Sequence, residues 1–228
     1  MTEPRLSPLL TAKGLCKSYP SGDGWVHPLR GVDITVCPGQ FVAVTGPSGA
    51  GKSTLLHILG FLERPDKGSY HLREKDVSCL DDEALSRLRS SCVGFVFQAY
   101  NLISQYTLAE NIAMPFLYHP KPPGNVSELA LLALEEVGLS GRKTHRPNQL
   151  SGGEMQRAAI ARALVIDPLV VLADEPTGNL DTENAGKIAH IFQKLHEKGT
   201  SLIVVTHDNE IARAADRVLH MNEGRLYE

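Results

Sequence analysis

Short hydrophobic runs alternate with helical patterns over most of the chain. A continuously apolar run predicts a strand that is covered on both faces, and such runs occupy residues 41–46, 93–98, 169–173 and 201–207. Hydrophobic residues at helical spacing predict helices at 54–62 and 182–199. Strands that alternate with helices in this way indicate an α/β fold with a parallel sheet.

Other patterns precede, interrupt and follow this alternation. Short β-rich runs at 9–15 and 31–36 come before the first buried strand, and short apolar runs close the chain after residue 216. A polar segment lies between the helix at 54–62 and the run at 93–98.

From Thr107 to about Val165 the pattern is helical, although prolines and a glycine break it at 120–124. The clearest helix in this region is expected at 127–139, with Ser127 as its N-cap. The region is therefore expected to form a helical lobe inserted into the α/β core.

Composition excludes several classes of function. Hydrophobic residues make up 42% and charged residues 21% of the 228 residues, which is typical of a globular protein. The net charge of -3, without a long basic run, argues against a nucleic-acid partner. The 4 cysteines form no CxxC pair, so we expect reduced, buried thiols and no zinc site.

No membrane-targeting signal is expected in the chain itself. Residues 1–10 have neither the basic region nor the apolar region of a signal peptide. No apolar run approaches the roughly 18 residues that a membrane span needs. Any role at a membrane must therefore come through a partner.

Residues 46–53, GPSGAGKS, match the phosphate-loop pattern G-x-x-x-x-G-K-S between a predicted strand and a predicted helix. The glycines allow several N–H groups to point at phosphate oxygens, and the helix start adds positive charge. Lys52 is expected to reach the β- and γ-phosphates, and the Ser53 hydroxyl to bind Mg²⁺. The residues expected at the nucleotide are Gly46, Pro47, Ser48, Gly49, Ala50, Gly51, Lys52, Ser53 and Thr54.

Acidic residues end the predicted strand within VVLADEPTGNLD, residues 170–181. In a phosphate-loop fold this strand ends beside the loop, so Asp174 is expected to hold Mg²⁺, through water. Glu175 is expected to point elsewhere because side chains alternate along an extended chain. It would then orient or deprotonate the water that attacks the γ-phosphate.

A second anion site is predicted at LSGGEMQR, residues 150–157. Ser151 would cap a helix, two glycines would allow close approach, and N–H groups would be free at the helix start. One chain then has two phosphate-binding ends but one set of catalytic residues. A head-to-tail homodimer resolves this, with each ATP between the Lys52 loop of one chain and the Ser151 helix of the other.

These motifs, in this order, resemble the nucleotide-binding subunits of ABC transporters over essentially the whole chain. The resemblance implies the ABC ATPase fold: an α/β phosphate-loop core with a parallel sheet, an N-terminal antiparallel β subdomain and an inserted α-helical lobe. It also implies one domain over 1–228, with 1–98 and 166–228 as the nucleotide-binding core and about 99–165 as the lobe.

The same resemblance implies roles for individual residues. Glu175 is the catalytic glutamate, Gln98 senses Mg²⁺ and the attacking water, and His207 contacts the γ-phosphate. Asp181 acts across the dimer. The ATP-contacting signature of the partner copy is Ser151, Gly152, Gly153 and Glu154.

The family stacks an aromatic side chain on adenine. Tyr19 is at the expected place, and Trp25 in the neighbouring loop is the alternative.

The sequence that flanks the motifs is similar to that of one branch of the family. Residues 95–116, 172–181 and 204–208 resemble LolD-type, MacB-type and FtsE-type ATPases. The branch implies an ATPase bound peripherally to the cytoplasmic face of the inner membrane, on integral membrane permease subunits with a periplasmic domain. It would power lipoprotein release or export; the alternative is FtsE-type gating of a membrane protein that controls cell-wall hydrolases. The branch member stays open.

Tyr100 to Tyr106, with Met114 and Phe116, is expected to form part of the groove for the partner's cytoplasmic helix. Core packing of the helical lobe is the alternative role for these residues.

Overall fold

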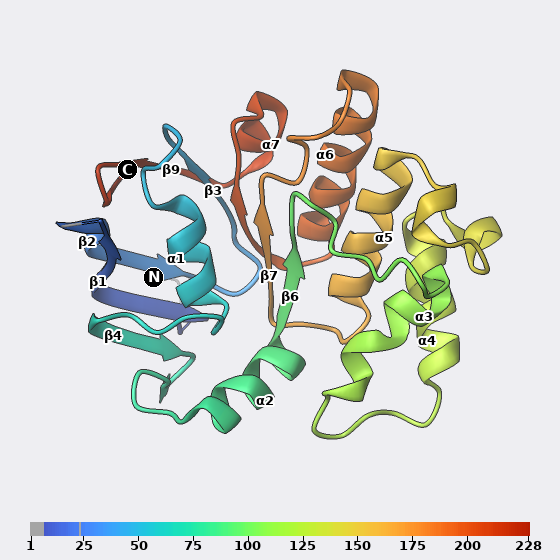
Figure 1. Ribbon diagram of the computed structural model, residues 1–228, viewed down its shortest axis with the longest axis horizontal. Helices are drawn as coiled ribbons and strands as arrows, with labels where there is room; N and C mark the ends of the chain where they lie inside the picture. The colour runs from blue at the N-terminus through green and yellow to red at the C-terminus, as the bar shows by residue number, and fades with distance from the viewer. Residues whose placement is uncertain (1–6, 23) are drawn as a thin grey trace, which may run out of the picture.

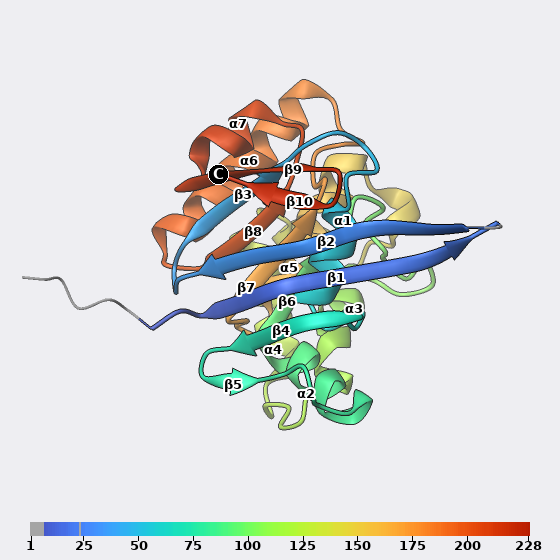
Figure 2. The same cartoon turned by 90° about the vertical axis from the view of Figure 1, so that its left-hand side faces the viewer.

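The computed structural model describes residues 7–22 and 24–228, so part of the N-terminal stretch considered for a signal peptide, residues 1–6, lies outside it. A six-stranded sheet runs through the middle of the molecule, and a four-stranded sheet covers one side of it (Figure 1). Figure 2 shows the four-stranded sheet face on, with the six-stranded sheet behind it.

The six-stranded sheet has the order β10-β9-β3-β8-β7-β6. Its five strands from β9 to β6 are parallel, and β10 pairs antiparallel with β9. The bounds are β3 Phe41–Thr45, β6 Val93–Val96, β7 Val170–Asp174, β8 Ser201–Val205, β9 Arg217–Asn222 and β10 Arg225–Tyr227. The four continuously apolar runs are therefore confirmed as strands of a parallel sheet.

The strands β3, β6, β7 and β8 are largely apolar because each contributes to two cores. In β7, Val170 and Leu172 face the core under the four-stranded sheet, whereas Val171 and Ala173 face the core under the helices. Side chains alternate along a strand, so burial on both faces confines polar residues to the strand ends.

The four-stranded sheet is antiparallel, with the order β2-β1-β4-β5. Its bounds are β1 Leu10–Ser21, β2 Gly24–Val36, β4 Lys67–Leu72 and β5 Lys75–Asp76. The expected N-terminal antiparallel β subdomain is confirmed. Strands β4 and β5 come from the segment that was expected only to be polar.

Helices cover both faces of the six-stranded sheet (Figure 1). Helix α1 packs in the core beneath the four-stranded sheet, while α5 and α6 cover the other face, with α3 and α4 packed on α5. Within the described residues, we find no helix long and apolar enough to cross a membrane. The bounds are α1 Lys52–Leu59, α2 Asp82–Cys92, α3 Leu108–Ala113, α4 Val126–Glu136, α5 Gly152–Leu164, α6 Thr182–Glu197 and α7 Asn209–Ala214, with 3₁₀ turns η1 Met114–Leu117, η2 Ser140–Arg142 and η3 Pro147–Gln149.

Two local expectations are wrong, and one helix was not expected. Helix α2 lies in the segment expected to be polar; most of its residues are polar, and Leu85 is the one that is fully buried. Asn125, not Ser127, precedes the first residue of α4, which places Ser127 inside the helix. All four cysteines carry free thiols, but none is fully buried: Cys79 is exposed, and Cys16, Cys37 and Cys92 are partly buried.

Replacing Gly94 tests how closely β6 approaches α5. A Cβ at this position would lie 2.4 Å from the main-chain oxygen of Ala163, so the strand or the helix would have to shift. We expect Gly94→Ala to lower the free energy of unfolding by about 1–3 kcal/mol, measured from the urea midpoint at constant slope. Gly124→Ala, whose Cβ would have no neighbour within 4 Å, is the matched control. A wild-type midpoint for Gly94→Ala would contradict this account.

Candidate active site

The phosphate loop connects β3 to α1. Gly46, Gly49 and Gly51 all have positive φ, at 140°, 78° and 105°. A Cβ on Gly46 would lie 2.0 Å from the main-chain oxygen of Met221, and one on Gly51 would lie 2.0 Å from that of Pro28. Gly46 and Gly51 are thus required by neighbouring backbone as well as by conformation, and Gly49 by conformation alone. Gly51 caps α1 without a side chain, which leaves N–H groups of the first turn available to an anion.

Lys52 is the first residue of α1, and its side chain is buried in the loop. Its Nζ donates to the carbonyl oxygens of Gly46, at 2.7 Å, and Pro47, at 2.9 Å. The same atom lies 3.5 Å from Nε2 of His207, which follows β8. The ammonium group is therefore held at the mouth of its own loop by neutral acceptors.

Asp174 ends β7, and Glu175 leaves the sheet in a left-handed conformation, with φ of 44°. The sequence-based explanation of its direction, strand alternation, is wrong, because Glu175 is no longer extended. Its Oε1 lies 3.1 Å from Nε2 of His207, and its Oε2 accepts from the His207 amide at 3.1 Å. Burial raises the pKa of Glu175, and the nearby charges of His207 and Lys52 oppose that shift.

Gln98 follows β6, and its side chain lies against Gly178 in the loop after Glu175. Its Nε2 donates to Oδ1 of Asn179 at 3.2 Å, and Nδ2 of Asn179 donates to the main-chain oxygen of Gln98 at 3.1 Å. Asn179 was missed from the sequence, although it lies in the same acidic segment as Asp174 and Asp181.

One cavity of about 600 Å³ joins most of the predicted residues. Pro28 and Gly178 also line it, and neither was expected from the sequence. The predicted residues at the cavity are Ser48, Gly49, Gly51, Lys52, Ser53, Thr54, Gln98, Asp174, Glu175 and His207. Four distant segments thus supply phosphate-binding, acidic and imidazole groups to one opening.

The predicted signature residues are not at this cavity. Ser151 caps α5: its Oγ accepts from the Glu154 amide at 3.3 Å, and the Glu154 carboxylate accepts from the Ser151 amide at 2.9 Å. These hydrogen bonds lower the pKa of Glu154, with Arg142 contributing. A Cβ on Gly153 would lie 2.5 Å from Oδ1 of Asn184, and one on Gly152 would lie 3.1 Å from a tyrosine hydroxyl.

Asp181 lies at the start of α6 and also away from the cavity. Its Oδ1 accepts from the Asn184 amide at 2.8 Å, and hydrogen bonds from Asn184 lower the pKa of Asp181. Since Asn184 also packs on Gly153, the starts of α5 and α6 form one surface.

The two candidate aromatic residues differ in their surroundings. The Tyr19 hydroxyl donates to Glu63, and Thr54 in the first turn of α1 lies within hydrogen-bonding reach of it. Burial and Glu63 raise the pKa of Tyr19 to about 12. Trp25 lies near the turn between β1 and β2 and is 65% exposed. Tyr19 is therefore the one of the two with a contact to the phosphate-loop helix.

The groove expected at 100–106 with Met114 and Phe116 is divided into two cavities. Tyr106 and Met114 line one of about 690 Å³ on the helical lobe, and Phe116 also contributes to the helical core. Asn101 lines the other cavity, of about 500 Å³.

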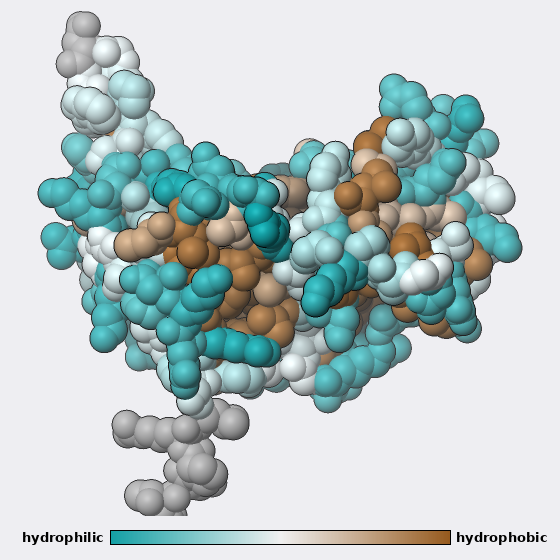
Figure 3. All heavy atoms as spheres, turned by 90° about the horizontal axis from the view of Figure 1, so that it is seen from below, coloured by the Kyte–Doolittle hydropathy of each residue, from teal (hydrophilic) through white to brown (hydrophobic). Residues whose placement is uncertain are grey.

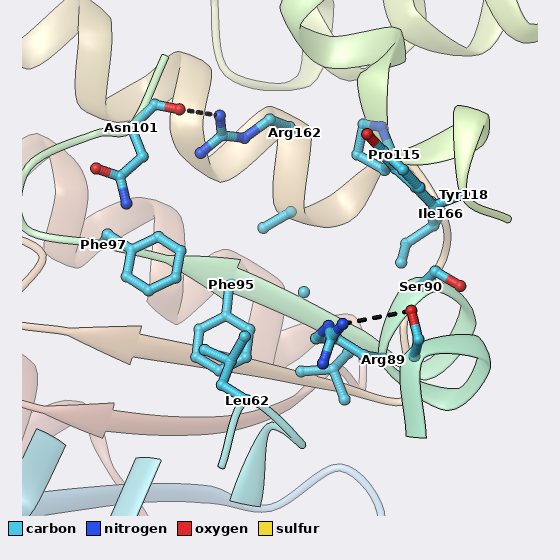
Figure 4. Close-up of a pocket in the computed structure, with 14 residues that line it drawn as sticks. Leu62, Arg89, Ser90, Phe95, Phe97, Asn101, Pro115, Tyr118, Arg162 and Ile166 are labelled. Carbon is cyan, nitrogen blue, oxygen red and sulfur yellow. Dashed lines mark hydrogen bonds between the residues drawn. The ribbon is translucent and has the colours of Figure 1, made fainter. Parts of the chain in front are cut away.

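The Asn101 cavity lies between β6, α2 and α5 (Figure 4). In it, Phe95 and Phe97 lie on one side, Arg162 on another and Tyr118 opposite. On the face seen from below, hydrophobic residues gather on both sides of a more polar ridge (Figure 3).

Arg162 holds the backbone beside this cavity. Tyr100 and Asn101 have positive φ, at 61° and 51°, and the Arg162 guanidinium donates to both of their carbonyl oxygens. This left-handed pair was not foreseen from the sequence, since neither residue is glycine.

The model of the family described as "ABC transporter" matches residues 29–178. A lipoprotein-releasing system ATP-binding protein LolD of Legionella pneumophila is 46% identical over 96% of this chain and 97% of its own length. A macrolide export ATP-binding/permease protein MacB of Chlorobaculum tepidum is 49% identical over 91% of this chain. This chain spans about a third of that MacB protein, 32% of its length.

Among solved structures, the chain is similar to a dimeric post-hydrolysis state of the ATP-binding cassette MJ0796 bound to ADP and Pi. The TM-score is 0.88 and the identity 37%, over 96% of this chain and 97% of that one. The order of the motifs, the two sheets with their helices, and these matches agree. The chain therefore belongs to the ABC transporter family and carries its ATP-hydrolysing domain.

Proposed function

We propose that two copies of this chain close head to tail around two ATP molecules and drive a membrane partner. The observation that carries the proposal is the separation of two anion-binding helix starts in one chain. Lys52 at the start of α1 faces the cavity, whereas Ser151 at the start of α5 does not line it. A second copy would supply Ser151, Gly152, Gly153, Glu154 and Asp181 to each cavity. The dimeric MJ0796 cassette, which is similar to this chain, supports that arrangement.

ATP would occupy the phosphate loop, with Tyr19 stacked on adenine. Residues 46–54 would surround the phosphates, and the N–H groups at the start of α1, which has no side-chain cap, would donate to phosphate oxygens. Lys52 would exchange its two carbonyl partners for phosphate oxygens, because an ammonium group bonds more strongly to an anion than to a neutral acceptor.

The oxygen donors at the cavity suit Mg²⁺. The Ser53 hydroxyl, the Gln98 carboxamide and the Asp174 carboxylate all line it. Mg²⁺ at phosphate sites takes one or two carboxylates together with phosphate and water oxygens, so a single carboxylate with neutral oxygens fits. These three residues would hold the ion, which would offset the negative charge of the phosphates and of Asp174.

Glu175 would act as general base. Its carboxylate would accept a proton from the water that attacks the γ-phosphorus, while the bond from that phosphorus to the bridging oxygen breaks and ADP leaves. His207 would hold the Glu175 carboxylate, to which it already hydrogen-bonds, and would contact the γ-phosphate.

The membrane partner would dock beside the helical lobe. We propose residues 99–165 as a lobe distinct from a core of 1–98 and 166–228, with the Asn101 cavity at their junction. That cavity presents aromatic side chains next to Arg89 and Arg162, which suits an amphipathic helix. We propose that this partner is an integral membrane permease with a periplasmic domain, and that the chain is peripheral on the cytoplasmic face of the inner membrane. The names of the relatives, a lipoprotein-releasing system ATP-binding protein and a macrolide export ATP-binding/permease protein, support a permease partner and a role in lipoprotein release or export.

Glu175→Gln should separate binding from hydrolysis. The amide cannot accept the proton, so kcat should fall by about 10²-fold or more while ATP binding persists. ATP should then trap the variant as a dimer. Phosphate release and light scattering measure the two effects. Glu135→Gln, an exposed change on α4, is the matched control. Hydrolysis at the wild-type rate by Glu175→Gln would remove Glu175 from the mechanism.

Ser151→Arg tests the cross-dimer site. A long cation at the start of α5 should block closure on the partner's ATP but leave nucleotide binding by the monomer unchanged. Loss of the cap should cost about 1 kcal/mol, so melting temperature is checked first. Ser127→Arg, in the first turn of α4, controls for the added arginine. In the Glu175→Gln background, ATP-dependent dimers of Ser151→Arg by light scattering would exclude the model.

A further inference from the structure

Gln98 and Asn179 form a reciprocal pair across 81 positions of sequence. The main-chain oxygen of Gln98 can only accept, so Nδ2 of Asn179 must face it, at 3.1 Å. Oδ1 of Asn179 then faces Nε2 of Gln98, at 3.2 Å. The two hydrogen bonds fix which end of each carboxamide is which.

This pairing commits one end of the Gln98 side chain and leaves the other for a ligand. Nε2 is directed to Asn179, so Oε1 is the remaining acceptor on a side chain that lines the cavity with Ser53 and Asp174. A Cβ on Gly178 would lie 2.8 Å from Nε2, which shows how closely the carboxamide packs on this turn.

Asn179 lies in a turn that is itself held at both ends. The Gly178 amide donates to the Glu175 oxygen at 3.1 Å, and the Leu180 amide donates to the Thr177 oxygen at 3.0 Å. Asp181 then caps α6. The anchor of Gln98 is therefore a short, hydrogen-bonded link between the residue that follows β7 and the start of α6.

We propose that Asn179 is a positioning residue that holds the Gln98 oxygen toward the metal of the bound nucleotide. Asparagine suits this position because it supplies one donor and one acceptor at the same reach. Aspartate would place an acceptor against the Gln98 carbonyl oxygen, and alanine would release the carboxamide. The inference rests on the proposed role of Gln98 in binding Mg²⁺.

Asn179→Ala tests the inference in the Glu175→Gln background, where ATP is not turned over. The affinity for a fluorescent ATP analogue is measured with Mg²⁺ and with EDTA. We expect the tightening caused by Mg²⁺ to shrink by about three- to tenfold, as for the loss of two neutral hydrogen bonds, while the affinity in EDTA stays unchanged. The side chain is exposed, so the fold should persist, and melting temperature checks it. Asn125→Ala is the matched control.

A second measurement needs neither metal nor nucleotide: ¹⁵N NMR follows how fast the side-chain N–H protons of Gln98 exchange with water. In the wild type, its bonded proton should exchange slowly with water, and in Asn179→Ala that protection should be lost. A double-mutant cycle completes the test: Asn179→Ala should add little to Gln98→Ala, because both remove the same oriented oxygen.

These experiments test separately whether Asn179 positions Gln98 and whether Gln98 binds Mg²⁺. Wild-type Mg²⁺ dependence in Asn179→Ala, or effects of the two changes that simply add, would overturn the positioning role while leaving Gln98 at the metal. Wild-type Mg²⁺ dependence in Gln98→Ala would remove Gln98 from the metal site, and the inference about Asn179 would fail with it.

Discussion

The parallel pairing of β3, β8 and β7 is the constraint on which the rest of the structure depends. It sets Val44, Val205 and Asp174 side by side at one edge of the sheet. The pairing continues past the strands, since the Glu175 amide donates to the Val205 oxygen at 2.9 Å and the Thr206 amide to the Val44 oxygen at 3.1 Å. Loops that are distant in sequence leave from this edge, so Lys52 meets His207 although 155 positions separate them.

The edge of the sheet brings the Glu175 carboxylate together with Lys52 and His207, whose positive charge favours its ionised form. Burial disfavours the ionised form of Glu175, while His207 and Lys52 favour it. The surface at the starts of α5 and α6 has a different construction. Ser151 and Asp181 cap α5 and α6, and Gly153 packs against Asn184 between them. The helix starts that would meet a partner's nucleotide are thus built as one unit, apart from the cavity that binds the chain's own nucleotide.

Contiguous features could be predicted from the sequence, and features that join distant segments could not. The phosphate loop and the buried strands were predictable, because glycine spacing and continuous apolar runs are local signals. Helix α2 was not predicted because most of its residues are polar and only Leu85 is fully buried. Strand β5 is two exposed residues, and in β4 only Tyr70 and Leu72 are fully buried. The direction of Glu175 depends on a left-handed backbone, and the Asn179–Gln98 pair depends on a fold that brings position 179 to position 98.

The central claim is that one chain's Ser151 completes the other chain's Lys52 site, and mixing two defective chains tests it most directly. In the Glu175→Gln background, tagged Lys52→Ala and untagged Ser151→Arg chains should each fail to dimerise alone. In a mixed head-to-tail dimer, one site combines Lys52 of the untagged chain with Ser151 of the tagged chain and is therefore intact. The other site holds both substitutions, so the new arginine faces a phosphate loop that binds no ATP. ATP should then recover the untagged chain on the tagged one. If the mixture stays monomeric at ATP concentrations that dimerise the unaltered background, Ser151 does not act across the dimer.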